Sequence, residues 1–174
     1  MTDRYRTFAA FNRWANERLY AKAAELSDAE YRADRGAFFK SVHGTLNHLL
    51  VADRIWMHRF DGTGDYPTEL DAILFDRLAD LHAARRAEDE RIARYMEGLD
   101  QAKLGSEFTY RTIVNPKTIT QPLAPAIDHF FNHQTHHRGQ VHALLTGLRG
   151  RDFAPSLDLL MFQRETGVDL SRAS

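Results

Sequence analysis

The sequence predicts an all-α protein, a four-helix bundle that forms one domain over residues 1–174. Four long segments place apolar residues at steps of three and four, the spacing typical of amphipathic helices. One short stretch rich in β-branched and aromatic residues lies between the third and fourth segments. A chain of 174 residues, 43% of them hydrophobic, is long enough for one core and leaves little room for a second domain.

The first two predicted helices cover residues 3–26 and 39–60. The apolar row of the first consists of Phe8, Phe11, Ala15, Leu19 and Leu26. The row of the second consists of Val42, Leu46, Leu49, Trp56 and Phe60. The Asp-Gly-Thr-Gly sequence at 61–64 has the composition of a turn, so we expect the second helix to end there.

The last two long helices are predicted over residues 70–99 and 123–148. The highly charged third segment has a heptad-like row of Leu74, Leu78, Leu81, Ile92, Tyr95 and Leu99. The row of the fourth consists of Ile127, Phe130, Val141, Leu144, Leu145 and Leu148, and the glycines that follow predict its end. Residues 108–120 surround an Asn-Pro turn and predict a short β-hairpin or extended excursion before the fourth helix. A short C-terminal helix is expected near 156–163.

The composition excludes several classes of function. The 23 basic and 24 acidic residues give a net charge of −1, which offers no general attraction for nucleic acid or anionic lipid, so we expect neither as a partner. The absence of cysteine excludes disulfides, thiolate zinc sites, iron–sulfur clusters and a cysteine nucleophile. The N-terminus has no apolar signal core and no run approaches the roughly 20 apolar residues of a membrane span, so we expect a cytoplasmic protein.

Histidine is the residue type that points to a metal. Five of the nine histidines lie on the fourth predicted helix, but only His133 and His137 combine i,i+4 spacing with an inward direction. This spacing stacks two imidazoles on one face, where both can reach one ion. From the spacing alone, a core His137 bonded to a backbone carbonyl beside a surface His133 stays open as the alternative.

Other polar residues interrupt the apolar rows. Asp53 lies between two apolar positions of the second helix, where its carboxylate could accept from a ligand imidazole or pair with an arginine of another helix. His48 lies on the flank of the same row and has the position of a boundary residue. On the third helix Glu88 could orient a ligand or a water in a wet interior, or could belong to a solvated face. We expect His43 and His58 at the surface.

Two segments taken together resemble a known family. The sequences TLNHLLVADRIW at 45–56 and NHQTHHRGQ at 132–140 are similar to those of the DinB family, within the DinB/YfiT-like superfamily. NRWAN at 12–16 and LDLL at 157–160 also fit, so the resemblance covers nearly the whole chain. Each motif alone is loose, whereas their order and spacing are specific.

The resemblance implies a four-helix bundle, commonly homodimeric, with a divalent metal held by His48, His133 and His137. Three neutral imidazoles leave a coordination position open, and zinc or nickel would suit nitrogen ligands. The residues that we expect to orient these ligands are Asp53, Gln140, Arg138 and Glu88.

The activity that follows is that of a metal-dependent enzyme acting on a small electrophile. It would use either an external low-molecular-weight thiol, as an S-transferase does, or water, as a hydrolase does. The alternative is a non-catalytic, metal-stabilised dimer that serves as a stress-response binding module. A plain helical bundle with core histidines is a third hypothesis, and it predicts no dependence on metal.

Overall fold

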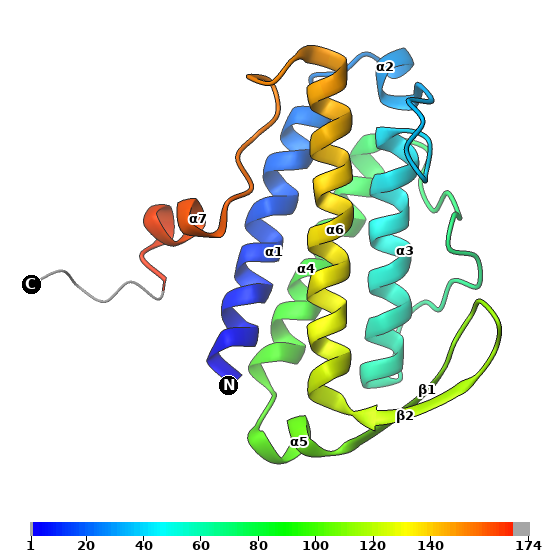
Figure 1. The fold of residues 1–174 in the computed structure, drawn as a ribbon, viewed down its shortest axis with the longest axis vertical. Helices are drawn as coiled ribbons and strands as arrows, with labels where there is room; N and C mark the ends of the chain where they lie inside the picture. The colour runs from blue at the N-terminus through cyan, green and yellow to red at the C-terminus, as the bar shows by residue number, and fades with distance from the viewer. Residues whose placement is uncertain (1, 169–174) are drawn as a thin grey trace, which may run out of the picture.

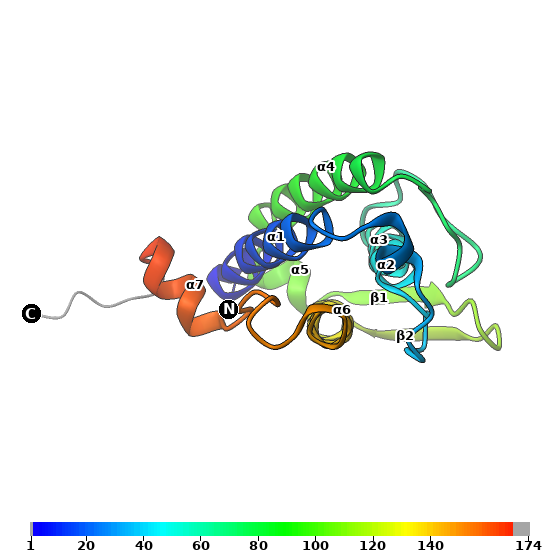
Figure 2. The same cartoon turned by 90° about the horizontal axis from the view of Figure 1, so that it is seen from above.

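The computed structural model describes residues 2–168 and contains four long helices packed side by side (Figure 1). These helices are α1 (Thr2–Ala23), α3 (Val42–Asp61), α4 (Leu78–Glu97) and α6 (Leu123–Arg149). Helices α1 and α6 run in one direction, and α3 and α4 run in the other (Figure 1). Each long helix packs against two of the others: α1 and α3 both contact α4 and α6 (Figure 2). The predicted helical bundle is therefore confirmed.

Short elements complete the fold. They are the helices α2 (Asp28–Arg32), α5 (Gln101–Gly105) and α7 (Leu159–Thr166) and the strands β1 (Glu107–Arg111) and β2 (Thr118–Pro122). The two strands pair antiparallel with Thr109 opposite Thr120, whose hydroxyl oxygens are 2.9 Å apart. This confirms the predicted hairpin before the last long helix. Helix α7 lies beside α1, away from the other long helices, and begins three residues later than expected (Figure 1).

The core consists of two apolar clusters separated by a polar layer. One cluster contains Trp56, Met57, Ile92 and Phe130, and the other contains Leu19, Leu46, Leu50, Leu81 and Leu145. On α1, α4 and α6 the buried polar residues fall between the positions that the two clusters occupy. On α3 Asp53 does so, whereas His48 lies within the stretch that the second cluster occupies. These polar residues include Asn12, Asn16, His48, Asp53, Arg85, Asp89, Gln134, His137 and Arg138. The layer places polar chemistry at mid-height in the bundle.

Helix α4 begins at Leu78, whereas the apolar periodicity predicted a start at residue 70. The reason is that side chains of α3 bind the backbone of the preceding connection. The Asn47 amide pairs with both the N–H and the carbonyl of Phe75, at 3.0 and 3.2 Å, and His48 contacts the Leu70 carbonyl at 2.7 Å. Leu74 still packs against the core, but from this connection rather than from a helix.

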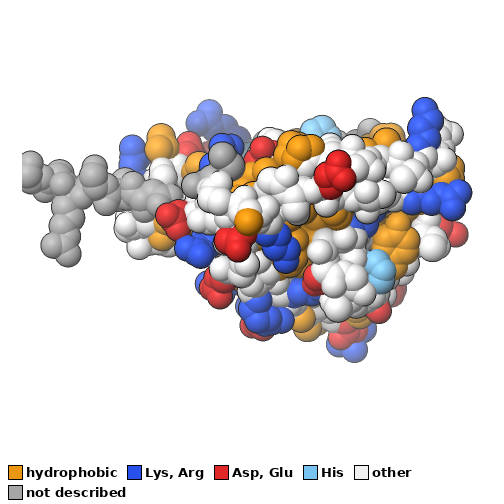
Figure 3. Space-filling model, turned by 90° about the horizontal axis from the view of Figure 1, so that it is seen from below, with side chains coloured by type: hydrophobic (Ala, Val, Ile, Leu, Met, Phe, Trp, Pro, Cys, Tyr) orange, Lys and Arg blue, Asp and Glu red, His pale blue; other side chains and the backbone are white. Residues whose placement is uncertain are grey.

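Residues 62–77 therefore form the one long connection between α3 and α4, and they follow the outer side of α3 (Figure 1). No helix within residues 2–168 has the length and apolar character needed to cross a membrane. Figure 3 shows the face at the hairpin end, where basic and acidic side chains are interspersed with hydrophobic ones.

Candidate metal centre

The start of α3 determines how the chain enters the site. Ser41 caps the helix, with its hydroxyl accepting from the Gly44 N–H at 3.0 Å. A Cβ at Gly44 would lie 2.2 Å from the Phe39 carbonyl oxygen, so only glycine allows the segment before the helix to approach this closely. The close approach brings the Phe39 ring onto His48, with ring centroids 3.7 Å apart.

Three histidines from two helices meet on one side of the polar layer. His48 comes from α3, and His133 and His137 lie one turn apart on α6. The Nε2 atom of His48 is 3.3 Å from that of His133 and 3.2 Å from that of His137. Within residues 2–168, this is the one group of three or more histidine or acidic side chains whose ligand atoms lie within 4.8 Å of one another.

The outer nitrogens of two of these rings are held by oxygen acceptors. His48 Nδ1 lies 2.7 Å from the Leu70 carbonyl oxygen, and His137 Nδ1 lies 2.7 Å from the Gln140 amide oxygen. Because these oxygens only accept, each Nδ1 carries the proton and each Nε2 presents a lone pair. Two lone pairs 3.2 Å apart repel each other, and a shared cation removes that repulsion. The arrangement could therefore hold a divalent metal.

The protonation states favour metal binding. Burial, reinforced by the neighbouring rings, lowers the pKa of His48 to about 4 and that of His133 to about 3. Burial also lowers the pKa of His137. The three imidazoles are consequently neutral near pH 7, the form in which histidine ligates a metal.

The two sides of the cluster differ. On one side Phe39 stacks on His48 and presents its ring to His137, with centroids 5.5 Å apart. On the other side His48 and His133 line a cavity of about 330 Å³ between α3, α6 and the β1–β2 hairpin. Most of its other lining residues are apolar or aromatic: Ala52, Ile55, Trp56, Leu70, Tyr110, Ile113 and Val114. The cavity therefore gives a ligand access to His48 and His133.

Comparison with known proteins agrees with this geometry. The sequence profile of the DinB family matches residues 1–164. The chain belongs to the DinB family. It is also similar to Protein DinB of Bacillus subtilis (strain 168), with 26% identity over 145 residues that cover 78% of this chain and 80% of that protein.

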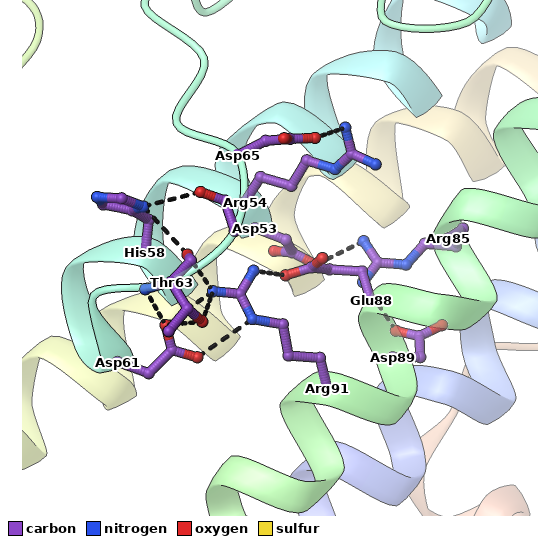
Figure 4. Close-up of polar contacts among 11 residues, drawn as sticks. Asp53, Arg54, His58, Asp61, Thr63, Asp65, Arg85, Glu88, Asp89 and Arg91 are labelled. Carbon is purple, nitrogen blue, oxygen red and sulfur yellow. Dashed lines mark hydrogen bonds and ion pairs between the residues drawn. The ribbon is translucent and has the colours of Figure 1, made fainter.

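Four residues of this DinB-family chain were expected to orient the histidine ligands. Of these four, Gln140 contacts a histidine of the cluster, His137. Asp53 instead pairs with Arg85 of α4 at 2.6 Å, and both side chains are fully buried (Figure 4). Two partners were considered for the Asp53 carboxylate, a ligand imidazole and an arginine of another helix. The structure shows the arginine.

Glu88 and Arg138 also have their partners away from the histidines. Glu88 accepts from Arg91 at 2.9 Å (Figure 4). Arg138 donates to the Asn12 side chain and lies over the Phe11 ring, on the α1 side of α6. The expectation that these two residues orient a ligand is not met, because rotation along each helix turns them toward α1 or the α3–α4 connection.

Sequence reasoning missed several residues around the site in this family member. Phe39 and the Leu70 carbonyl lie outside the long helices as the structure defines them, where periodicity gives no direction. His43, expected at the surface, is buried and contacts the Phe75 carbonyl at 3.2 Å. Asp89 accepts from both Asn12 and Asn16, and its position four residues after Arg85 was the available signal.

Proposed function

We propose that this protein is a divalent-metal-dependent enzyme whose site consists of His48, His133 and His137 and the cavity beside them. The observation that carries the proposal is the direction of the imidazoles. Two of the three have their Nδ1 protons directed to oxygen acceptors, so that their Nε2 lone pairs face each other across 3.2 Å. A buried core histidine has no need of such an arrangement, whereas a metal ligand does.

The distances between the Nε2 atoms support zinc or another ion with metal–nitrogen bonds of similar length. Two imidazole nitrogens bound at 2.0–2.1 Å to one tetrahedral zinc lie about 3.3 Å apart. The Nε2 separations of 3.3 and 3.2 Å from His48 agree with that value. Nickel also accepts imidazole ligands, so the donor set does not by itself select between the two metals.

A zinc or nickel ion at these ligands, with one position open, would supply Lewis acidity and lower the pKa of an incoming water or thiol. The protein's own residues do the rest. Phe39 shields one side of the site from water, and Gln140 holds the His137 ring in its ligating orientation. The cavity receives a small electrophile, and any thiol must be external because the chain has no cysteine.

The first test is metal content. Protein purified without chelator should contain about one zinc or nickel per chain by elemental analysis, and His133→Ala combined with His137→Ala should abolish this binding. His142→Ala is the matched control, since it removes an imidazole from the same helix outside the cluster. Full occupancy in the double variant would refute the assignment.

The second test is turnover. The metal-loaded protein should conjugate a low-molecular-weight thiol to a small electrophile, or hydrolyse an ester, and removal of the metal by chelation should stop the reaction. A melting temperature that rises with metal, without turnover on either panel, would favour the non-catalytic binding module instead.

A further inference from the structure

We infer that the cavity beside the three histidines takes a small organic anion, a monocarboxylate with an apolar body, and that Arg59 binds its carboxylate. The inference rests on the proposed function for the role of this ligand as a substrate, but the anion site itself does not require a metal. Arg59 is the one Lys, Arg, Asp or Glu side chain among the lining residues that the structure describes.

The position of Arg59 on α3 directs it into the cavity. It follows His48 by eleven residues, close to three full turns, so the two residues share one face of the helix. The same face carries Ala52, Ile55 and Trp56, which also line the cavity. Eleven residues correspond to about 16 Å along the helix axis. A ligand that contacts Arg59 therefore extends along an apolar wall toward the histidines.

The guanidinium is fixed in place but not neutralised. It lies between the rings of Trp56 and Tyr110, with its central carbon 4.7 and 4.9 Å from their centroids. One Nη donates to the Arg111 carbonyl at 2.9 Å, while the buried Nε has no hydrogen-bond partner among the described residues. An arginine has five N–H donors, so most of them remain for a ligand.

A nearby arginine of the same helix differs from Arg59 in its partner. Arg54, on the same helix, pairs with Asp65 at 2.8 Å. No carboxylate within residues 2–168 forms an ion pair with Arg59, although its side chain is partly buried. A permanent charge in an apolar cavity without a counter-ion creates a favourable position for one anionic group. A single cation with aromatic neighbours suits a monocarboxylate with an apolar body.

The experiment measures binding of two probes of the same shape to metal-free, full-length protein. The probes are 3-phenylpropanoate and its neutral amide, 3-phenylpropanamide, and the signal is the fluorescence of Trp56. The chain has two tryptophans, so Trp14→Phe provides the background, since Trp14 lies on α1 beside Phe162. We expect the carboxylate to bind at least about tenfold more tightly than the amide.

Variants assign this preference to Arg59. Arg59→Gln should remove the preference for the carboxylate, and Arg59→Lys should retain part of it, because lysine keeps the charge but not the planar fork. Arg54→Gln is the matched control and should leave the preference unchanged. If Arg59 only ties the hairpin to α3, Arg59→Gln lowers the melting temperature but the carboxylate preference persists, and the inference is wrong.

Two further outcomes separate this inference from the proposed function. Equal binding of both probes to the wild-type protein, or no binding of either at millimolar concentration, would overturn the inference whatever the metal content. A His133→Ala variant that has lost metal but still prefers the carboxylate would support the anion site on its own. Should Arg59→Gln fail to fold, Arg59→Lys and the comparison of the two probes on the wild-type protein decide the question.

Discussion

His48 and His137 face each other through their Nε2 atoms at 3.2 Å, and both rings direct the opposite nitrogen to an oxygen acceptor. The acceptor for His48 belongs to the backbone, and the acceptor for His137 is the side chain of Gln140. The second of these can be removed by mutation. The relationship therefore gives a direct test of how the ligands are oriented.

Replacing Gln140 by alanine should weaken zinc binding by about 10–100-fold, the usual effect of losing a residue that orients a metal-binding histidine. Competition with a zinc-chelating dye measures this affinity. Because Gln140 also contacts His136 at 3.2 Å, His136→Ala serves as the control and should bind zinc with nearly wild-type affinity. Unchanged affinity in Gln140→Ala would show that the His137 ring needs no such support.

The metal-free protein should lose stability as the pH falls from about 6.5 to about 4. In the folded state the pKa of His48 is lowered to about 4 and that of His133 to about 3, whereas both are near 6.5 in the unfolded chain. Between these values the unfolded state binds more protons, so acid favours unfolding. The loss is on the order of 1–3 kcal/mol per histidine.

Urea unfolding in the presence of EDTA at several pH values measures this dependence. His133→Leu should reduce the slope of stability against pH in this range, and His142→Ala should not. Saturating zinc should raise the stability at pH 7 and make the acid transition steeper, because protons then compete with the metal for the imidazoles. A flat pH profile for the metal-free protein would contradict the neutral state assigned to these rings.

The two glycines Gly44 and Gly139 should respond to alanine in opposite ways. A Cβ at Gly44 would lie 2.2 Å from the Phe39 carbonyl oxygen, whereas a Cβ at Gly139 would have no atom within 4 Å. Gly139→Ala should therefore raise stability by up to about 1 kcal/mol through helix propensity. Gly44→Ala should lower stability and also weaken zinc binding, because Phe39 must move off His48.

Thermal unfolding of the two variants, with and without zinc, checks this pair of predictions. The free space at Gly139 also shows that no other described segment approaches the backbone of α6 closely at this glycine. A destabilised Gly139→Ala would mean that another surface covers this exposed part of α6.

Replacing Asp53 by alanine should destabilise the protein by about 3–5 kcal/mol, because Arg85 would be left buried without this partner. Zinc affinity of the folded fraction should stay within a few-fold of the wild-type value, since Asp53 does not contact the three histidines. Chemical denaturation and dye competition measure the two effects separately. A large loss of zinc affinity with little change in stability would contradict this prediction and indicate that Asp53 orients a metal ligand.

Much of the fold follows from periodicity, because the apolar rows of α1, α3 and α6 are long enough to place the ends of each helix within about three residues. The same rotation puts His133 and His137 on one inward face. The predicted start of the third helix at residue 70 was wrong, because the apolar row includes Leu74, which lies in a loop. An apolar side chain can reach the core from a loop as well as from a helix.

The rest of the site depends on contacts between distant segments. Asp53 had two chemically reasonable partners, and only the packing of α4 against α3 selects Arg85. Phe39 and the Leu70 carbonyl reach His48 from outside the helices, so no periodicity could assign them. Arg59 lies on the same helical face as His48, a signal that the sequence does contain.

The backbone and the side chain of Leu70 have different roles in the site. Its carbonyl oxygen fixes the imidazole of His48, while its side chain forms part of the cavity wall. Every amino acid has the same carbonyl group, so exchange of the side chain can reshape the cavity without altering the ligand. A designer who wishes to reshape the cavity while preserving the three histidines of the proposed metal site could begin there.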